Sequence, residues 1–434
     1  MKDVIKGYID FISENKTERE CVQAIIRAAR EHGYTDLAEA KQLKPGDRVW
    51  YNKMGKSIAL FQIGTEDIAK GMNILGAHLD SPRLDAKQRP VWEKDGLVYL
   101  NTHYYGGIKK YQWLALPLAI HGVVFLTDGS RVDIVIGEKA DDPVFCISDI
   151  LPHIAQDQMK KTAAEFIEGE KLDLVIGSFG EADKGKDVIL GLLKDKYGIA
   201  EDDFMSAELE IVPAGAARES GLDRSCVLGY GQDDRVCSYT SFQALLDTPV
   251  SKRTSCCLLV DKEEIGSCGA TGMRSRFLDN AVAAVVEKLG APSEFVVRRA
   301  LENSMMLSSD VNSAYDPLNW ELYDKTNSSF LGRGLVFNKY TGSRGKSNAS
   351  DANPEFIALV RAQMEKHNVT YQSAEMAKVD VGGGGTIALY AAYYGMQVID
   401  AGVPVLSMHA PWELTNRFDI QQAYEGYCTF LLID

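Results

Sequence analysis

Two adjacent acids that follow a short apolar run are the clearest candidates for chemistry in this chain. Residues 257–260 have the length and character of a buried strand, and Glu263 and Glu264 follow them in the segment CCLLVDKEEIGSCGATG. An ionised carboxylate that leaves water needs a cation or hydrogen-bond donors. Lys262 could serve one glutamate, or a metal could bind one and leave the other free as a base. Taken alone, the pattern fits two solvated acids in a turn equally well.

A second candidate is the pair His78 and Asp80 in GAHLDSPRLDAK, which follows the apolar run 72–77. In an extended segment a spacing of two places both side chains on one face. A histidine can then ligate a metal while the carboxylate orients its ring. An isolated pair of this kind is more often a surface contact.

Further acids and a histidine stand at comparable places. Asp233 and Asp234 come where a loop enters a helix, which is also a favoured place for a simple cap. Asp310 follows the apolar run 305–308, and His409 follows the run 403–408. In an open α/β sheet, ligands bind outside the carboxyl ends of the strands, so these residues could converge.

Two histidines and three or four carboxylates suit two divalent ions held ~3.5–4 Å apart. Zinc is the expected ion, with cobalt or manganese as alternatives. One acid would bridge the ions, and one glutamate would remain as a base for the attacking water.

These residues need a sheet to position them. Strands are predicted at 57–63, 72–77, 257–260, 305–308 and 403–408, and a helix after the capping box Thr17–Glu20, ended by Gly33. The glycines of VGGGGT let backbone approach a ligand, which makes Gly384 a candidate substrate-binding residue. YTGSRGKS lacks the first glycine of a phosphate loop.

The middle of the chain differs in composition. Residues 88–225 carry aromatic residues and glycines and then a charged stretch, and they are predicted to form an inserted domain. Within it, residues 208–212 (ELEIV) read as an exposed alternating strand. The candidate catalytic and metal-binding residues then lie in a discontinuous domain formed by residues 1–87 and 226–434. The predicted class is α/β, with a mixed central sheet flanked by helices.

Length and charge narrow the class of protein. A chain of 434 residues favours two domains, and a net charge of −14 disfavours nucleic acid and anionic membrane as partners. No apolar run reaches the ~20 residues of a membrane span, and the N-terminal segment is too charged for a signal peptide. The eight cysteines show no CxxC spacing, which favours reduced thiols and a cytoplasmic protein.

The motifs GAHLDSPRLDAK, DDRVCSY, VDKEEIGS, SSDVNSAYDP, VGGGGT and VLSMHAPWE resemble those of the M18 metallo-aminopeptidases, in the same order and over nearly the whole chain. That family includes aspartyl aminopeptidase and vacuolar aminopeptidase I. The resemblance implies that His78 and Glu264 ligate different metals. Asp233 would bridge them, through a cis bond to Asp234, although the residues alone leave open which aspartate bridges. Asp310 and His409 would complete the two shells, with Glu263 as general base and Asp80 orienting His78.

The resemblance also implies an assembly, in which the inserted domain is β-rich and mediates dimers that build a dodecamer. LPHIAQDQ matches the stretch that reaches a neighbour's active site, so His153 is the candidate there. One departure concerns specificity, because Asn338 stands where aspartyl aminopeptidase has a lysine for acidic side chains. Whether Lys339, Arg344 or Lys346 takes that role is open.

The predicted activity is hydrolysis of the N-terminal residue of a peptide, with an acidic, neutral or broad preference. A two-metal carboxypeptidase or N-acyl amino-acid deacylase is the alternative on the same scaffold. A non-catalytic assembly protein is the alternative of another class, and no missing ligand or base favours it.

Overall fold

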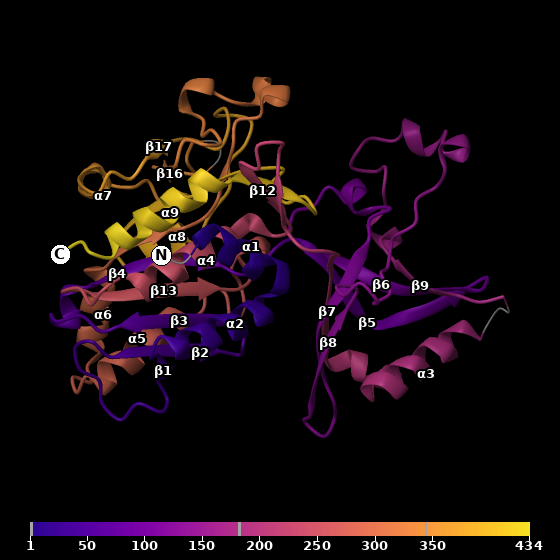
Figure 1. Ribbon diagram of the computed structural model, residues 1–434, viewed down its shortest axis with the longest axis horizontal. Helices are drawn as coiled ribbons and strands as arrows, with labels where there is room; N and C mark the ends of the chain where they lie inside the picture. The colour runs from indigo at the N-terminus through magenta and orange to yellow at the C-terminus, as the bar shows by residue number, and fades with distance from the viewer. Residues whose placement is uncertain (1–2, 181–183, 343–344) are drawn as a thin grey trace. The chain divides into compact units, whose positions relative to one another are not determined.

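The computed structural model describes residues 3–180, 184–342 and 345–434, and the chain divides into two compact units. The first unit comprises Met1–Asp80, Ala217–Met408 and Glu413–Asp434, and the second comprises Ser81–Ala216 and His409–Trp412. The chain therefore leaves the first unit directly after Asp80 and returns at Ala217 (Figure 1).

The described part of the first unit contains a nine-stranded sheet in the order β1-β2-β3-β13-β4-β14-β18-β16-β17. The strands β13, β4, β14 and β18 are mutually parallel, whereas β3 and β16 join this block antiparallel. The mixed sheet that the sequence predicts is thus confirmed. Its strands are β1 (Thr35–Asp36), β2 (Arg48–Lys53), β3 (Ser57–Gln62), β4 (Met72–His78), β13 (Thr254–Val260), β14 (Met305–Ser308), β16 (Leu335–Asn338), β17 (Tyr371–Ser373) and β18 (Gln397–Gly402).

Helices cover both faces of this sheet, each over its own apolar core. Side chains of α1, α2, α4, α7 and α9 pack on one face, and those of α5, α6 and α8 on the other. In Figure 1 the yellow α9 lies beside α4 and α1, with which it is in contact. The helices are α1 (Val4–Glu14), α2 (Glu18–Glu31), α4 (Gln232–Asp247), α5 (Phe277–Lys288), α6 (Glu294–Glu302), α7 (Pro354–Lys366), α8 (Ala388–Ala392) and α9 (Arg417–Phe430).

Local sequence signals explain how several of these elements begin and pack. The capping box at Thr17 and Glu20 is formed, and Gly33 follows α2 with the positive φ of 79° that favours glycine. On β4, a side chain at Gly76 would collide with Met306 of the neighbouring strand. Glycine at this position thus leaves room for the end of the Met306 side chain between β4 and β14.

A smaller five-stranded sheet in the first unit runs β11-β12-β20-β19-β15. It connects the entrance of α4 to the C-terminal part of the chain, because β12 pairs with β20. The strands are β11 (Arg218–Ser220), β12 (Cys226–Gly229), β15 (Asn312–Ser313), β19 (Pro404–Leu406) and β20 (Glu413–Asn416).

The second unit is built on a six-stranded antiparallel sheet in the order β8-β7-β10-β5-β6-β9. The helix α3 (Gly185–Tyr197) packs against β5, β6 and β9 (Figure 1). The strands are β5 (Arg83–Lys94), β6 (Leu97–Tyr105), β7 (Leu118–Phe125), β8 (Arg131–Ile136), β9 (Leu174–Ser178) and β10 (Ala207–Pro213).

The expectation of an exposed strand at ELEIV is wrong in one respect. Residues 209–213 of β10 are buried on both sides, including Glu210, whose carboxylate lies 3.2 Å from the Arg83 guanidinium. The alternation of charged and apolar residues suggested a solvated face because the sequence does not reveal this buried partner.

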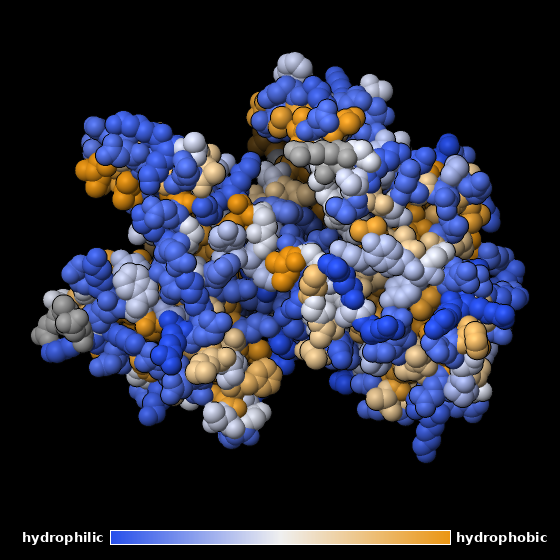
Figure 2. Space-filling view, turned by 180° about the vertical axis from the view of Figure 1, so that it is seen from behind, coloured by the Kyte–Doolittle hydropathy of each residue, from blue (hydrophilic) through white to orange (hydrophobic). Residues whose placement is uncertain are grey.

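The surface drawn in Figure 2 is mostly hydrophilic, with hydrophobic residues in separate small patches. Among the described residues, no helix has both the length and the apolar character needed to cross a membrane.

Candidate active site

His78 is the last residue of β4 and lies in a buried network of acids. Its backbone N–H donates to Asp234 Oδ2 (3.2 Å), and its Nε2 lies 3.3 Å from Asp233 Oδ1. Its Nδ1 lies 2.9 Å from the carbonyl oxygen of Asp80 and 3.4 Å from the Asp80 carboxylate. With Nδ1 held by Asp80, Nε2 faces the other carboxylates as a metal ligand would. Burial opposes protonation of His78, but hydrogen bonds that its ring donates to Asp233 and Asp80 raise its pKa well above the usual value.

Asp233 and Asp234 open α4, and the peptide bond between them is cis, as the family resemblance implies. Both have non-helical backbone angles, so their side chains are not placed by the helix repeat. The N–H of Asp233 donates to Glu413 Oε2 (3.0 Å). Burial raises the pKa of Asp234 well above its usual range, although His78 lowers it. The predicted helix entrance is confirmed, but these acids are buried in the fold rather than exposed as surface caps.

Glu263 and Glu264 lie on a single helical turn (Glu263–Ile265) directly beyond β13. Their backbone N–H groups donate to the two oxygens of Asp80, at 3.1 and 3.2 Å. Asp80 therefore holds both the His78 ring and the turn that carries the glutamates. The suggestion that Lys262 serves a glutamate is wrong, because its Nζ lies 2.9 Å from Asp261 Oδ2 instead. Lys262 has a left-handed backbone (φ 68°), which turns its side chain back toward the strand end.

Asp310 lies just beyond the end of β14, next to β4. The preceding Ser309 N–H donates to the Gly76 carbonyl (2.6 Å). On β18, a side chain at Gly402 would collide with the carbonyl oxygen of Asp310, so glycine is required for this close approach. Burial, together with the nearby charge of Asp234, raises the pKa of Asp310 well above its usual value.

The structure thus brings together six of the candidate residues. Ligand atoms of His78, Asp233 and Glu264 lie within 4.8 Å of one another, and so do those of His78, Asp234 and Asp310. Glu263 Oε2 lies 4.0 Å from His78 Nε2. Imidazole and carboxylate donors at this spacing fit a zinc-type ion.

The surroundings of Asp234 provide an independent test of whether a cation fits. Its Oδ1 is buried and has no hydrogen-bond partner within the described residues, whereas Oδ2 accepts from the His78 N–H and the Cys237 thiol is a weak donor near the carboxylate. A buried carboxylate oxygen in this situation is stabilised by a bound cation. The residues therefore fit a divalent metal.

His409 and His153 belong to the second unit. His409 Nδ1 lies 2.9 Å from the carbonyl oxygen of Gly107 and the residue has a left-handed backbone, whereas His153 is exposed on a short turn (Pro152–Ile154). Neither belongs to the groups of ligand atoms described above. Their contribution to the site stays a prediction.

The candidates for substrate contact lie around the glycine loop. Lys339 is half-exposed with Nζ 3.8 Å from Asp351, and Lys346 pairs with the same carboxylate at 3.0 Å. The Gly384 N–H donates to the Thr341 carbonyl (3.1 Å). Asn338 is buried at the end of β16, and Arg344 lies outside the described residues.

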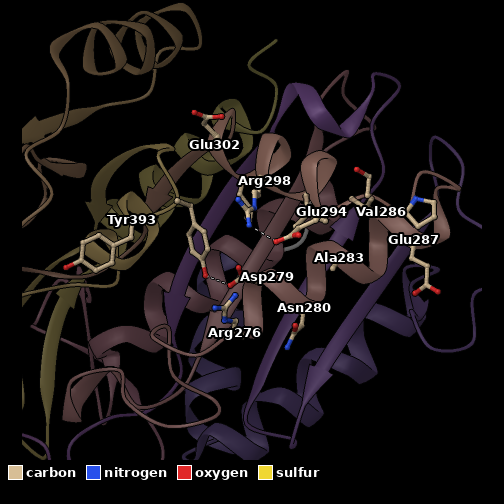
Figure 3. A pocket seen from close by; sticks show the side chains of 15 residues that line it. Arg276, Asp279, Asn280, Ala283, Val286, Glu287, Glu294, Arg298, Glu302 and Tyr393 are labelled. Atoms are coloured by element: carbon tan, nitrogen blue, oxygen red, sulfur yellow. Dashed lines mark hydrogen bonds and ion pairs between the residues drawn. The ribbon is translucent and has the colours of Figure 1, made fainter.

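A cavity of about 790 Å³ lies elsewhere in the first unit, among α5, α6 and Tyr393 with Tyr394. Figure 3 shows Arg298 and Glu294 facing one another along it, and they form a hydrogen bond of 2.6 Å. Its lining contains none of the predicted site residues. Its size therefore does not make it the reactive centre, since the grouped ligand atoms of His78, Asp233, Asp234, Glu264 and Asp310 lie at the strand ends.

Two residues of this site were not singled out from the sequence. Glu413 orients Asp233 through its backbone, and Asp261 receives Lys262. Both were visible as acids that end an apolar or aromatic run, one within APWE and one directly after Val260.

His78 and several acids that could hold a metal gather at the carboxyl ends of parallel strands, and Glu263 lies beside them as a further acid. This arrangement defines a metal-dependent hydrolase. Comparison with known proteins identifies the group. The model of the family described as "Aminopeptidase I zinc metalloprotease (M18)" matches residues 11–431, and the chain belongs to this family of metallo-aminopeptidases.

Individual relatives agree with this assignment. A probable M18 family aminopeptidase 1 from Clostridium acetobutylicum is 54% identical over 431 residues, which cover 97% of this chain and 93% of the relative. The crystal structure of an M18 aminopeptidase from Thermotoga maritima has a TM-score of 0.95 at 42% identity, covering 99% of this chain and 97% of that one. The structure of aminopeptidase I from Clostridium acetobutylicum has a TM-score of 0.92 at 52% identity, covering 98% and 94%.

Proposed function

We propose that this chain hydrolyses the N-terminal residue of peptides, with Glu263 as the general base and two divalent ions, zinc in the first place, held by the acids around it. His78 and Glu264 would hold different ions, and Asp233, Asp310 and His409 would complete the ligand sets. The observation that carries this assignment is the double role of Asp80, which receives both glutamate N–H groups and fixes the His78 ring.

The position of Glu263 supports its role as the base. Its carboxylate is partly exposed, while Asp80, Asp233 and Asp234 are more deeply buried. A partly exposed carboxylate can exchange protons with water, as a base must in each cycle. Glu263 takes a proton from the attacking water and later returns it to the leaving amine.

When bound, divalent ions polarise the scissile carbonyl and lower the pKa of the attacking water. The chain's own contribution is to hold the carboxylates in place through the backbone contacts of Asp80, Glu413 and His78. A cluster this rich in carboxylates attracts the free ammonium group of a substrate, which accounts for action at the N-terminal end.

The preferred N-terminal residue depends on the region of Asn338. An uncharged, buried side chain there gives no cation for an acidic substrate, and the exposed Lys339 and Lys346 both lie near Asp351. A neutral or broad preference follows, with Lys339 and Gly384 as candidate contacts.

The proposed assembly rests on the family resemblance. We predict that residues 88–225 mediate dimers and that dimers build a dodecamer in which His153 reaches a neighbour's site. Light scattering of the purified protein tests the oligomer number.

The eight cysteines are unpaired with one another, as a cytoplasmic location predicts.

The deciding experiment is a rate panel with free-amine aminoacyl substrates carrying Asp, Glu, Leu, Met, Lys or Ala. The panel is run with chelator and after adding back zinc, cobalt or manganese. Chelator-sensitive turnover that favours Leu or Met supports the proposal. A preference for Asp or Glu keeps the mechanism but overturns the inferred preference.

An N-acetylated peptide provides the matched control for the position of cleavage. It is expected to resist hydrolysis, because it lacks the ammonium group. Cleavage of the blocked peptide would favour a deacylase or carboxypeptidase on the same scaffold, and absence of turnover with every metal would favour a non-catalytic assembly protein.

A further inference from the structure

A group of four charged residues and one threonine lies beside the turn that carries the two glutamates. This group, the Asp261 hub, consists of Glu18, Lys56, Asp261, Lys262 and Thr271. Lys56 Nζ lies 2.7 Å from Glu18 Oε1 and 3.5 Å from Asp261 Oδ2. The same Asp261 oxygen accepts from Lys262 Nζ (2.9 Å) and from Thr271 Oγ1 (2.6 Å).

Most of the hub is shielded from water. The side chains of Glu18 and Asp261 have an exposed fraction of 0% and that of Lys56 has 7%, whereas Lys262 at the edge of the hub has 24%. Replacing a buried ion group by packed apolar residues is often neutral or stabilising. Stability alone therefore does not explain this arrangement, and its location offers another reason.

The hub joins three elements of the first unit to the start of the loop 261–271, which carries Glu263 and Glu264. Asp261 directly follows β13, Lys56 directly precedes β3, and Glu18 opens α2. Because Leu259 of β13 pairs with Ile58 of β3, Lys56 and Asp261 lie side by side where the two strands end. The hub thus holds the position at which the chain leaves the sheet.

The far end of the loop returns to the same place. The N–H of Asp261 donates to the Thr271 carbonyl (3.3 Å), which also accepts from Ser57 Oγ (2.7 Å). Residues 261–271 are therefore closed into a loop at the hub, with Glu263 and Glu264 near its beginning.

Lys262 transmits this constraint to the glutamates. A left-handed backbone is strained for lysine and persists only where surrounding contacts hold it. Its ammonium group is held by Asp261, and its carbonyl accepts from the Ser267 N–H (2.6 Å). The left-handed turn directs the next two N–H groups toward Asp80.

We propose that the Asp261 hub positions the general base, by holding Lys262 in the left-handed turn that sets the Glu263 carboxylate against the His78 cluster. Asp261, Lys56 and Lys262 are positioning residues, since they act through Glu263. This inference rests on the proposed role of Glu263 as the base.

The test compares three variants in the full-length, metal-loaded protein. Thr271→Val and Lys262→Met each remove one hydrogen bond to Asp261, and Lys56→Met removes the central cation. Lys53→Met, at the end of β2 on the same hairpin, is the matched control that removes a lysine outside the hub. The measurements are kcat, KM, bound metal, the folded fraction and the pH profile of kcat.

Thr271→Val and Lys262→Met are expected to lower kcat by about 10- to 100-fold per folded molecule, since small misplacements have effects of this size. KM and metal content stay within about twofold, and the acidic limb of the kcat profile moves. Lys56→Arg restores most of what Lys56→Met loses. Lys53→Met keeps wild-type kcat.

Three outcomes overturn the inference, and they differ in whether the base assignment also fails. If Glu263→Gln is inactive while Thr271→Val and Lys262→Met keep wild-type kcat, the hub has no positioning role and the base assignment stands. Activity lost only in proportion to the folded fraction leads to the same conclusion. If Glu263→Gln remains active, the base assignment fails, and the positioning role fails with it.

Discussion

Acidic residues of the two units differ in what surrounds them. In the first unit, Asp234 and Asp261 are buried, and this burial raises the pKa of each. In the second unit, Glu168 and Glu170 are exposed on short turns, and lysine partners lower their pKa values. Burial thus disfavours the anion at Asp234 and Asp261, whereas lysine partners favour the anion at Glu168 and Glu170.

The difference shows which acids can be positioned for chemistry. An exposed carboxylate exchanges its lysine partner for water at little cost, so its place is not fixed. Asp80 has two backbone N–H donors and lies against a histidine ring, all within strand ends. These contacts hold Asp80 well enough to orient the His78 ring and the turn that carries Glu263.

The largest expected effect separates Glu263 from an exposed acid. Glu263→Gln should lower kcat by about 10²- to 10⁴-fold while metal is retained, because the amide cannot accept the proton. Glu170→Gln, at the exposed pair with Lys87, should leave kcat unchanged. Steady-state kinetics with metal analysis checks both variants. A Glu263→Gln enzyme with near-wild-type kcat would contradict the role of Glu263 as the base.

Metal affinity should distinguish the two aspartates at the start of α4. Asp234→Asn is expected to weaken metal binding by about 10- to 100-fold, as for residues that support a ligand set. Asp233→Asn should weaken it more, since Asp233 faces His78 Nε2. Competition with a chelator measures both, with the exposed Asp142→Asn as control. A stronger effect at Asp234 would make that residue the bridging ligand.

A pH-dependent stability difference is expected at Asp400 on β18. Burial raises its pKa from 3.8 to about 6, although the Thr386 and Ser308 hydroxyls lower it. The folded state therefore binds more protons than the unfolded state between these values, and the unfolding free energy falls as pH rises through them. Relative to wild type, Asp400→Asn should gain about 1.4 kcal/mol between pH 5 and pH 7.

Denaturant unfolding at the two pH values measures this difference. Asp142→Asn is the control from the second unit, where backbone hydrogen bonds from Lys139 and Gly137 lower the aspartate pKa. Its difference from wild type should stay constant between pH 5 and pH 7. A flat difference for Asp400→Asn as well would mean that Asp400 is ionised in the folded state throughout this range.

The smallest effect is expected at the exposed pair of Lys87 and Glu170, whose charged atoms lie 2.6 Å apart. Lys87→Met should shift the thermal midpoint by less than about 2 °C, since exposed ion pairs contribute little. Thermal unfolding at low and high salt measures this. A larger shift would show that the turns of the second unit depend on their ion pairs.

Much of the sheet and its edge could be predicted from the sequence because the apolar runs are short and end in polar residues. His78, Glu263 and Asp310 each come directly or within three residues after such a run, and all three lie at the ends of parallel strands. The capping box at Thr17 was also predicted correctly, because it involves only residues that are near one another in the chain.

Other features depend on contacts that no local pattern contains. Lys262 was expected to serve a glutamate, but a left-handed backbone directs it to Asp261. Glu210 was expected to face solvent, but Arg83 lies beside it in the fold. The role of Asp80 as an acceptor for two N–H groups requires residues 183 and 184 positions away.

The order of the strands has a consequence for synthesis. β4 lies between β13 and β14, although residues 81–216 separate it from both in the chain. A ribosome therefore releases His78 long before Asp233, Glu263 and Asp310 exist, and pairing over such separations is slow. We expect nascent chains that end before residue 310 to be inactive toward aminoacyl substrates, so that the peptidase cannot act on other unfinished proteins during its own translation. Turnover by chains arrested at that point would contradict this expectation.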